Sequence, residues 1–109
     1  MANAMFLAWS SPISPEADEE FNRWYVDTHI PQVRTAIPAV TQVRRYRLLG
    51  SGQAGAPVRY LCSYELADGD AAAAAAALAA AGKAQAFDLT PTMDLIGAPP
   101  ETHFLEPLD

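Results

Sequence analysis

Candidate side chains for proton transfer are few in this sequence: His29, the weaker second base His103 on the last predicted strand, and a set of tyrosines. An unperturbed imidazole has a pKa of ~6.5, so His29 is suited to take or give a proton. Tyr25 precedes His29 by one helical turn, a spacing at which two side chains meet on a helix. Tyr46 and Tyr64 lie within expected strands, and a buried hydroxyl there needs a polar partner. We therefore predict His29 and Tyr46 as catalytic residues and Tyr25 and Tyr64 as substrate-binding residues.

The same residues also admit structural roles, which the sequence leaves open. A histidine near the end of a helix can bond a free backbone carbonyl and interact favourably with the helix dipole. Tyrosines at these positions can form an aromatic core whose hydroxyl groups reach its rim.

Tryptophan and arginine residues are the next candidates for the wall of a binding site. Trp9 and Trp24 are expected in the core or lining a pocket, and we predict both to contact substrate. Arg44 and Arg45 are adjacent on a predicted strand, so one of them points inward. An inward arginine can bind a carboxylate or enolate oxygen, and we assign this role to Arg45. The alternative is an ion pair with an acid such as Glu65 across a dimer.

Composition limits the classes of function. The 109 residues are half hydrophobic and carry a net charge of −6, which excludes general disorder and argues against nucleic acid or anionic membrane as partners. No stretch approaches the ~18 apolar residues of a membrane span. The sequence has one cysteine and lacks a phosphate-binding glycine loop, a Rossmann fingerprint and a CxxC pair. We therefore expect one domain over residues 1–109, located in the cytoplasm, with neither cofactor nor metal.

Hydrophobic patterning and capping signals predict four strands and two helical regions. Ser14 followed by Pro15 predicts a helix start, Pro31 is expected to end or kink that helix near Ile30, and Gly82 is expected to stop the last helix. The strands are predicted at 5–9, 40–49, 58–66 and 102–106, and the helices at 14–30, 31–37 and from Asp68 or Asp70 to residue 81.

This βαββαβ order predicts an α+β fold of the ferredoxin-like type, a four-stranded antiparallel sheet with its helices on one face. The other face then exposes apolar residues of the first and third strands, which favours a homodimer packed sheet to sheet. The alternative is that residues 83–100 cover this face and keep the chain monomeric.

Residues 21–31, with the sequence FNRWYVDTHIP, and the later Arg44-Arg45-Tyr46 resemble the EthD-type family of the dimeric α+β barrel superfamily. The resemblance covers about residues 5–50. One departure is Pro38-Ala39, where relatives often have Pro-Gly. The resemblance implies a dimeric α+β barrel and, for some members, dehydration of aromatic polyketide precursors or a link to ether or aromatic degradation.

From the residues and the resemblance together, we predict a cofactor-independent acid–base enzyme of dehydratase, isomerase or cyclase type. Its substrate would be a small apolar carbonyl, phenolic or polyketide-like molecule. Two alternatives remain, a non-catalytic small-molecule-binding or stress-associated dimer and a cofactor-free monooxygenase of the same superfamily.

Overall fold

The computed structural model describes residues 3–54 and 56–108 and contains one four-stranded antiparallel sheet. The strand order is β2-β3-β1-β4, so the first and third strands lie at the centre, as in a ferredoxin-like α+β fold. The predicted fold class is confirmed. The strands are β1 (Met5–Ser10), β2 (Val40–Arg47), β3 (Tyr60–Leu66) and β4 (Glu101–Leu105), within about two residues of the predicted bounds at most ends.

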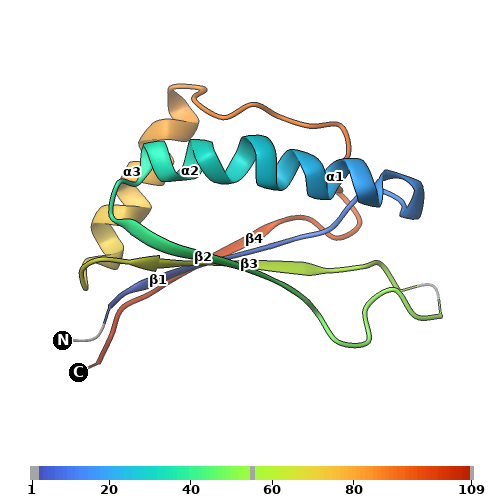
Figure 1. Ribbon diagram of the computed structural model, residues 1–109, viewed down its shortest axis with the longest axis horizontal. Helices are drawn as coiled ribbons and strands as arrows, with labels where there is room; N and C mark the ends of the chain where they lie inside the picture. Colours follow the sequence, from blue (N-terminus) through green and yellow to red (C-terminus); the bar gives the residue numbers. More distant parts are fainter. Residues whose placement is uncertain (1–2, 55, 109) are drawn as a thin grey trace.

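The first helical region is one rod, although the sequence predicts a break in it (Figure 1). It begins at Ser14, whose hydroxyl accepts a hydrogen bond from the Ala17 amide at 3.2 Å. The rod comprises a 3₁₀ turn η1 (Pro15–Ala17), α1 (Asp18–Trp24), a π-helical segment η2 (Tyr25–His29) and α2 (Ile30–Ala36).

The helical backbone continues through Pro31, and α2 begins at Ile30, within one residue of the predicted end or kink. Ile30 keeps helical angles, φ −58° and ψ −46°, although it precedes a proline. The π-helical segment lies directly before it, and its wider turn accommodates the proline without a break.

The second helix, α3 (Ala71–Lys83), begins at Asp70 and passes through Gly82. The Asp70 carboxylate accepts a hydrogen bond from the Ala73 amide at 2.9 Å. The sequence predicts that Gly82 stops this helix, but the helix continues to Lys83. Instead Gln85 adopts the left-handed conformation with φ 55°, and the Ala86 amide bonds the Ala81 carbonyl at 3.0 Å. This is a Schellman motif in which glutamine takes the place usually held by glycine.

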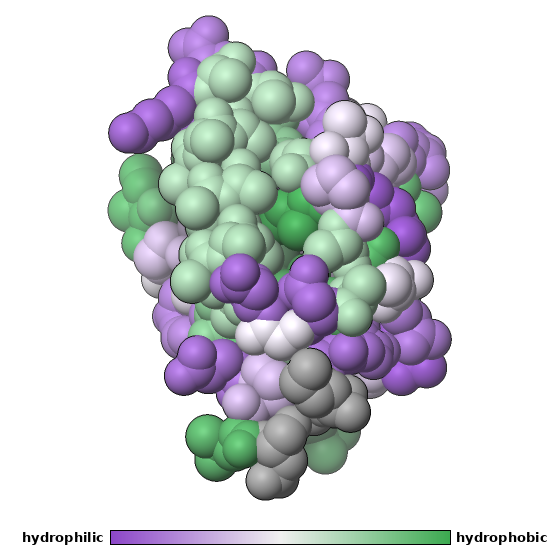
Figure 2. Space-filling view, turned by 90° about the vertical axis from the view of Figure 1, so that its left-hand side faces the viewer, coloured by the Kyte–Doolittle hydropathy of each residue, from purple (hydrophilic) through white to green (hydrophobic). Residues whose placement is uncertain are grey.

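The first helical rod and α3 cover the same face of the sheet, and the described chain leaves the other face bare (Figure 1). Strand alternation sends one set of side chains toward the helices. That set and the inward side chains of the helices form the core, whose largest fully buried members are Phe21, Tyr25, Val33, Tyr64 and Leu66. Figure 2, a view onto the end of the molecule where α3 lies, shows a broad band of weakly hydrophobic surface that corresponds to its alanines.

The connection between α3 and β4 lies along the helical layer. The Gln32 amide donates to the Asp88 carboxylate at 3.0 Å, and the Ile13 amide donates to the Thr92 carbonyl at 2.6 Å. Arg59 holds the far end, donating to the carbonyls of Ala98 and Pro99 at 3.0 Å. These contacts overturn the alternative in which this segment covers the bare face of the sheet.

None of the helices in the described part of the chain is long and apolar enough to cross a membrane.

Candidate functional site

A cavity of about 390 Å³ lies between the first helical rod, the sheet and the connection that follows α3. Its wall is mostly apolar, with a few polar side chains, which is the usual character of a small-molecule site. Four structural elements and the connection supply the lining residues, which are Phe6, Ala8, Trp9, Ser10, Trp24, Tyr25, His29, Val33, Leu78, Gly82, Phe87, Asp88, Leu89, Met93, Leu95, Pro100 and Thr102.

His29 sits among aromatic rings in this wall. Its imidazole stacks on the indole of Trp24, with ring centroids 4.9 Å apart and planes inclined by 20°. The edge of the Tyr25 ring contacts it at 4.9 Å, and Phe87 approaches from the connection at 5.8 Å. The structure therefore brings together three residues that the sequence assigned to the site, His29, Tyr25 and Trp24.

Three of the lining residues carry a buried polar atom that has no hydrogen-bond partner among the described residues. These atoms are the Ser10 hydroxyl, the Trp24 indole N–H and His29 Nδ1. A buried donor or acceptor without a partner costs about 1–3 kcal/mol. All three atoms are covered by neighbouring protein atoms in this structure and are not open to the cavity.

Burial lowers the pKa of His29 from 6.5 to about 4. The imidazole is therefore neutral at pH 7, with one nitrogen able to donate and the other able to accept. Burial also raises the pKa of Tyr25 and of Tyr64 well above the ordinary value of 10.0, so both phenols keep their protons. Asp88 is the one acidic residue among those that line the cavity.

Tyr46, predicted as a catalytic residue, lies apart from His29 and outside the cavity lining. It pairs with Leu61 across the strands, and Leu61 pairs with Trp9. This set lies on the bare face of the sheet, and 49% of Tyr46 is exposed there. Trp9 borders the cavity, but the same register directs its side chain to the bare face.

Arg45 and Tyr64 point to the helical face but lie outside the cavity lining. The Arg45 guanidinium packs between two rings, 4.5 Å from the centroid of Tyr25 and 5.1 Å from that of Tyr60. It makes no ion pair within the described chain. The prediction that one of Arg44 and Arg45 points inward is confirmed. Arg45 does not line the cavity itself, but it packs against Tyr25, which does. Tyr64 is fully buried beneath Tyr25 and stacks on Phe6 at 4.9 Å.

Sequence reasoning missed Ser10 and most of the wall contributed by the connection. Ser10 carries no pattern that marks it, because it ends a strand like many serines. The connection gave a partial signal, since Met93, Leu95 and Ile96 are too apolar for a solvated loop. Met93 and Leu95 line the cavity, while Ile96 is 92% exposed.

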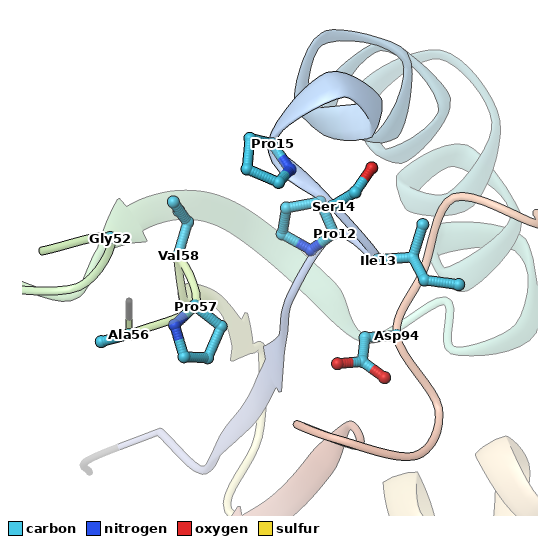
Figure 3. Close-up of a pocket in the computed structure, with 9 residues that line it drawn as sticks. All are labelled: Pro12, Ile13, Ser14, Pro15, Gly52, Ala56, Pro57, Val58 and Asp94. Atoms are coloured by element: carbon cyan, nitrogen blue, oxygen red, sulfur yellow. The ribbon is translucent and has the colours of Figure 1, made fainter. Parts of the chain in front are cut away.

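A second cavity, of about 420 Å³, lies between the start of the first helical rod and the β2–β3 hairpin (Figure 3). Prolines dominate its wall, and Asp94 is the one titratable residue among those lining it. The Asp94 carboxylate already accepts hydrogen bonds from the Ile96, Gly97 and Ala98 amides at 2.9–3.0 Å. These bonds lower the pKa of Asp94 and occupy its oxygens. This cavity therefore lacks a free group for chemistry.

The strand order and the helices on one face place the chain in the ferredoxin-like class of α+β proteins. The cavity between the helices and the sheet, lined by His29, is called the helix-side cavity below. Two solved structures share this fold over nearly the whole chain. An EthD family protein from Bacillus halodurans C-125 is 20% identical, with 97% of this chain and 99% of that chain aligned at a TM-score of 0.59. An EthD-like protein from Ralstonia eutropha JMP134 is also 20% identical, with 97% and 93% aligned at a TM-score of 0.61. The resemblance found in residues 5–50 is thus confirmed at the level of the fold.

A structure described as a dimeric ferredoxin-like protein of unknown function, from Thermobifida fusca YX, aligns less well. It is 15% identical over 97% of this chain and 92% of that chain, at a TM-score of 0.46. No family model and no curated protein matches the sequence.

Proposed function

We propose that this chain is a cofactor-independent acid–base enzyme of dehydratase, isomerase or cyclase type. Its substrate is a small apolar carbonyl, phenolic or polyketide-like molecule bound in the helix-side cavity. The observation that carries the proposal is an apolar cavity whose wall holds the His29 imidazole, stacked on the Trp24 indole and in edge contact with the Tyr25 ring. A ligand with an apolar body and one or two oxygens would suit this wall, because its apolar part would replace water there.

The depressed pKa of His29 keeps its imidazole neutral at pH 7, with a nitrogen lone pair free to accept a proton. A buried imidazolium is unfavourable here, so a proton taken from substrate carbon must be returned within the same cycle. In a dehydration, His29 would take the C–H proton and the C–H electron pair would form the new double bond. The C–O bond would break, and the proton would leave with the hydroxyl as water. An isomerisation would return the proton to another substrate atom.

The same pKa of about 4 is the observation that favours the second candidate function, a non-catalytic small-molecule-binding protein. A base that weak is far from the pH at which proton transfer is most efficient. In this case His29 would only donate or accept a hydrogen bond.

Ligand binding should be blocked by filling the cavity from α3. Gly82 lines it, and a Cβ at this position would meet nothing within 4 Å, so Gly82→Leu should place its side chain in the open space without strain. With 2-naphthol as a neutral phenolic probe, we expect saturable quenching of Trp24 fluorescence in a Trp9→Phe background. Gly82→Leu should weaken it, since the added side chain takes up part of the space open to the probe.

The matched control for that experiment is Ala80→Leu, the same addition at an exposed position of α3. It should leave the probe affinity unchanged. Equal binding by the Gly82→Leu protein would show that the probe binds elsewhere, and absence of saturable binding by the parent protein would contradict the proposed site.

The bare face of the sheet is proposed to pack on a second copy of the chain, with residues 1–109 forming one domain in each subunit. Leu7, Trp9, Leu61 and Tyr46 share this face by register, and Leu105 joins them from β4 with 44% exposure. Arg44, Glu65, Glu101 and His103 share the face by the same register, so it offers both apolar and ion-pairing groups to a second copy. A dimer across it would bury on the order of 1,600 Å² in total.

Sedimentation at micromolar concentration should give a species with twice the 11.7 kDa mass of one chain. Tyr46→Glu places a charge on the apolar face and should shift the protein toward monomer. Val26→Glu is the matched control, because Val26 is 52% exposed on the helical rod, away from the sheet. A parent protein that sediments as a monomer would refute this assembly.

A further inference from the structure

The π-helical segment η2 (Tyr25–His29) produces the contact between His29 and Trp24. The Ile30 amide donates to the Tyr25 carbonyl, five residues earlier rather than four. In a regular α-helix with about 100° per residue, residues five apart are turned about 140° from each other and their rings cannot stack. Here the rings of Trp24 and His29 stack at 4.9 Å, because the wider turn takes up one more residue.

Pro31 supplies a physical reason for that wider turn. Proline has no amide hydrogen, and in an α-helix its ring collides with the carbonyl of the residue four positions before it. That residue is Asp27, in the middle of the π-helical segment. Ile30 retains helical angles, so the collision is relieved by widening the turn and not by a break.

We propose that Pro31 is a positioning residue that, by enforcing the π-helical turn, holds the His29 imidazole against the Trp24 indole inside the cavity. This inference deepens the proposed function and rests on it, since it takes His29 as the working group of the site.

The stacked arrangement fixes the His29 ring from several sides. The indole of Trp24 covers one face, and Tyr25 and Phe87 contact the ring at 4.9 and 5.8 Å. Loss of the π-helical turn would rotate Trp24 away from His29 along the helix. The imidazole would then lose its largest apolar neighbour and become more accessible to water.

The direct test is Pro31→Ala, followed by NMR of the folded protein. Alanine removes the ring collision and restores the missing amide donor, so the segment should return to regular α-helix. We expect loss of the nuclear Overhauser effect between the Trp24 indole and the His29 imidazole. The pKa of His29 should rise from about 4 toward 6.5. The Tm should stay the same or increase, because alanine is the better helix former.

Pro38→Ala is the matched control, since Pro38 follows the same rod but lies outside the π-helical turn. It should leave the Trp24–His29 contact and the His29 titration unchanged. The inference is wrong if the Pro31→Ala protein keeps both the Trp24–His29 contact and the low pKa of His29. It is also wrong if both are lost together with a large fall in Tm, because Pro31 would then act on the stability of the whole fold. None of these readouts needs a substrate, so failure here is distinguishable from failure of the proposed function.

Discussion

The free energy of unfolding should fall by about 3 kcal/mol between pH 6.5 and pH 4, and His29→Gln should remove most of this fall. The folded protein holds His29 neutral down to about pH 4, whereas the unfolded chain binds a proton at that residue with a pKa of 6.5. Lowering the pH therefore stabilises the unfolded state. The free energy of unfolding is therefore highest above pH 6.5, where His29 is neutral in both states. It decreases as the pH falls and stops decreasing on account of His29 below about pH 4.

Urea titrations at closely spaced pH values would measure this dependence. His103→Gln is the matched control, because the side chain of His103 is 52% exposed on β4. We expect this variant to show the same change in the free energy of unfolding with pH as the parent protein. Asp94 also has a lowered pKa, but its contribution is lost only as the pH falls below 3.8, outside the window assigned to His29. An undiminished slope in the His29→Gln protein would mean that His29 is not buried as a neutral group.

The strands and their order could be predicted because strong local signals and one global rule agree. Alternating apolar residues, the Ser14 and Asp70 caps and the βαββαβ order all point to the same sheet. Local rules place two helix boundaries to within two residues but do not describe how the backbone passes them. Pro31 is tolerated because the preceding turn widens, and Gly82 is bypassed because Gln85 takes the left-handed position. In each case hydrogen bonds formed by neighbouring residues decide the outcome, and single-residue preferences do not contain them.

The site could be predicted only where helical spacing fixes neighbours. Tyr25 and His29 meet because they are four residues apart on the rod. The faces of β2 could not be assigned in this way, because alternation says that Arg45 and Tyr46 point to opposite sides but not which side meets the helices. Pairing of Arg45 with Cys62 and of Tyr46 with Leu61 decides it. The wall supplied by residues 84–100 depends on contacts such as Gln32–Asp88, 56 positions apart, which no local pattern encodes.

The two candidate functions differ in what they require of the cavity. A binding protein needs only the apolar wall and a few hydrogen bonds, and it gains nothing from a titratable group held neutral. A proton shuttle needs the neutral imidazole next to substrate carbon, together with a group that steadies the oxygen. The distinction therefore falls on His29.

Replacing His29 by Ala or by Gln should reduce turnover about 10²–10⁴-fold, the usual contribution of a positioned acid–base group. The substrate would be chosen among small carbonyl and phenolic compounds that displace 2-naphthol from the cavity. At pH 7 His29→Gln should melt closer to the parent protein than His29→Ala, since alanine leaves empty the space beside the Trp24 indole. Gln keeps a polar side chain but cannot carry a proton, so activity restored by Gln relative to Ala would assign His29 a hydrogen-bonding role. Loss of turnover in both variants with unchanged 2-naphthol affinity would assign proton transfer to His29, whereas a parallel fall of affinity and Tm would make it a structural residue.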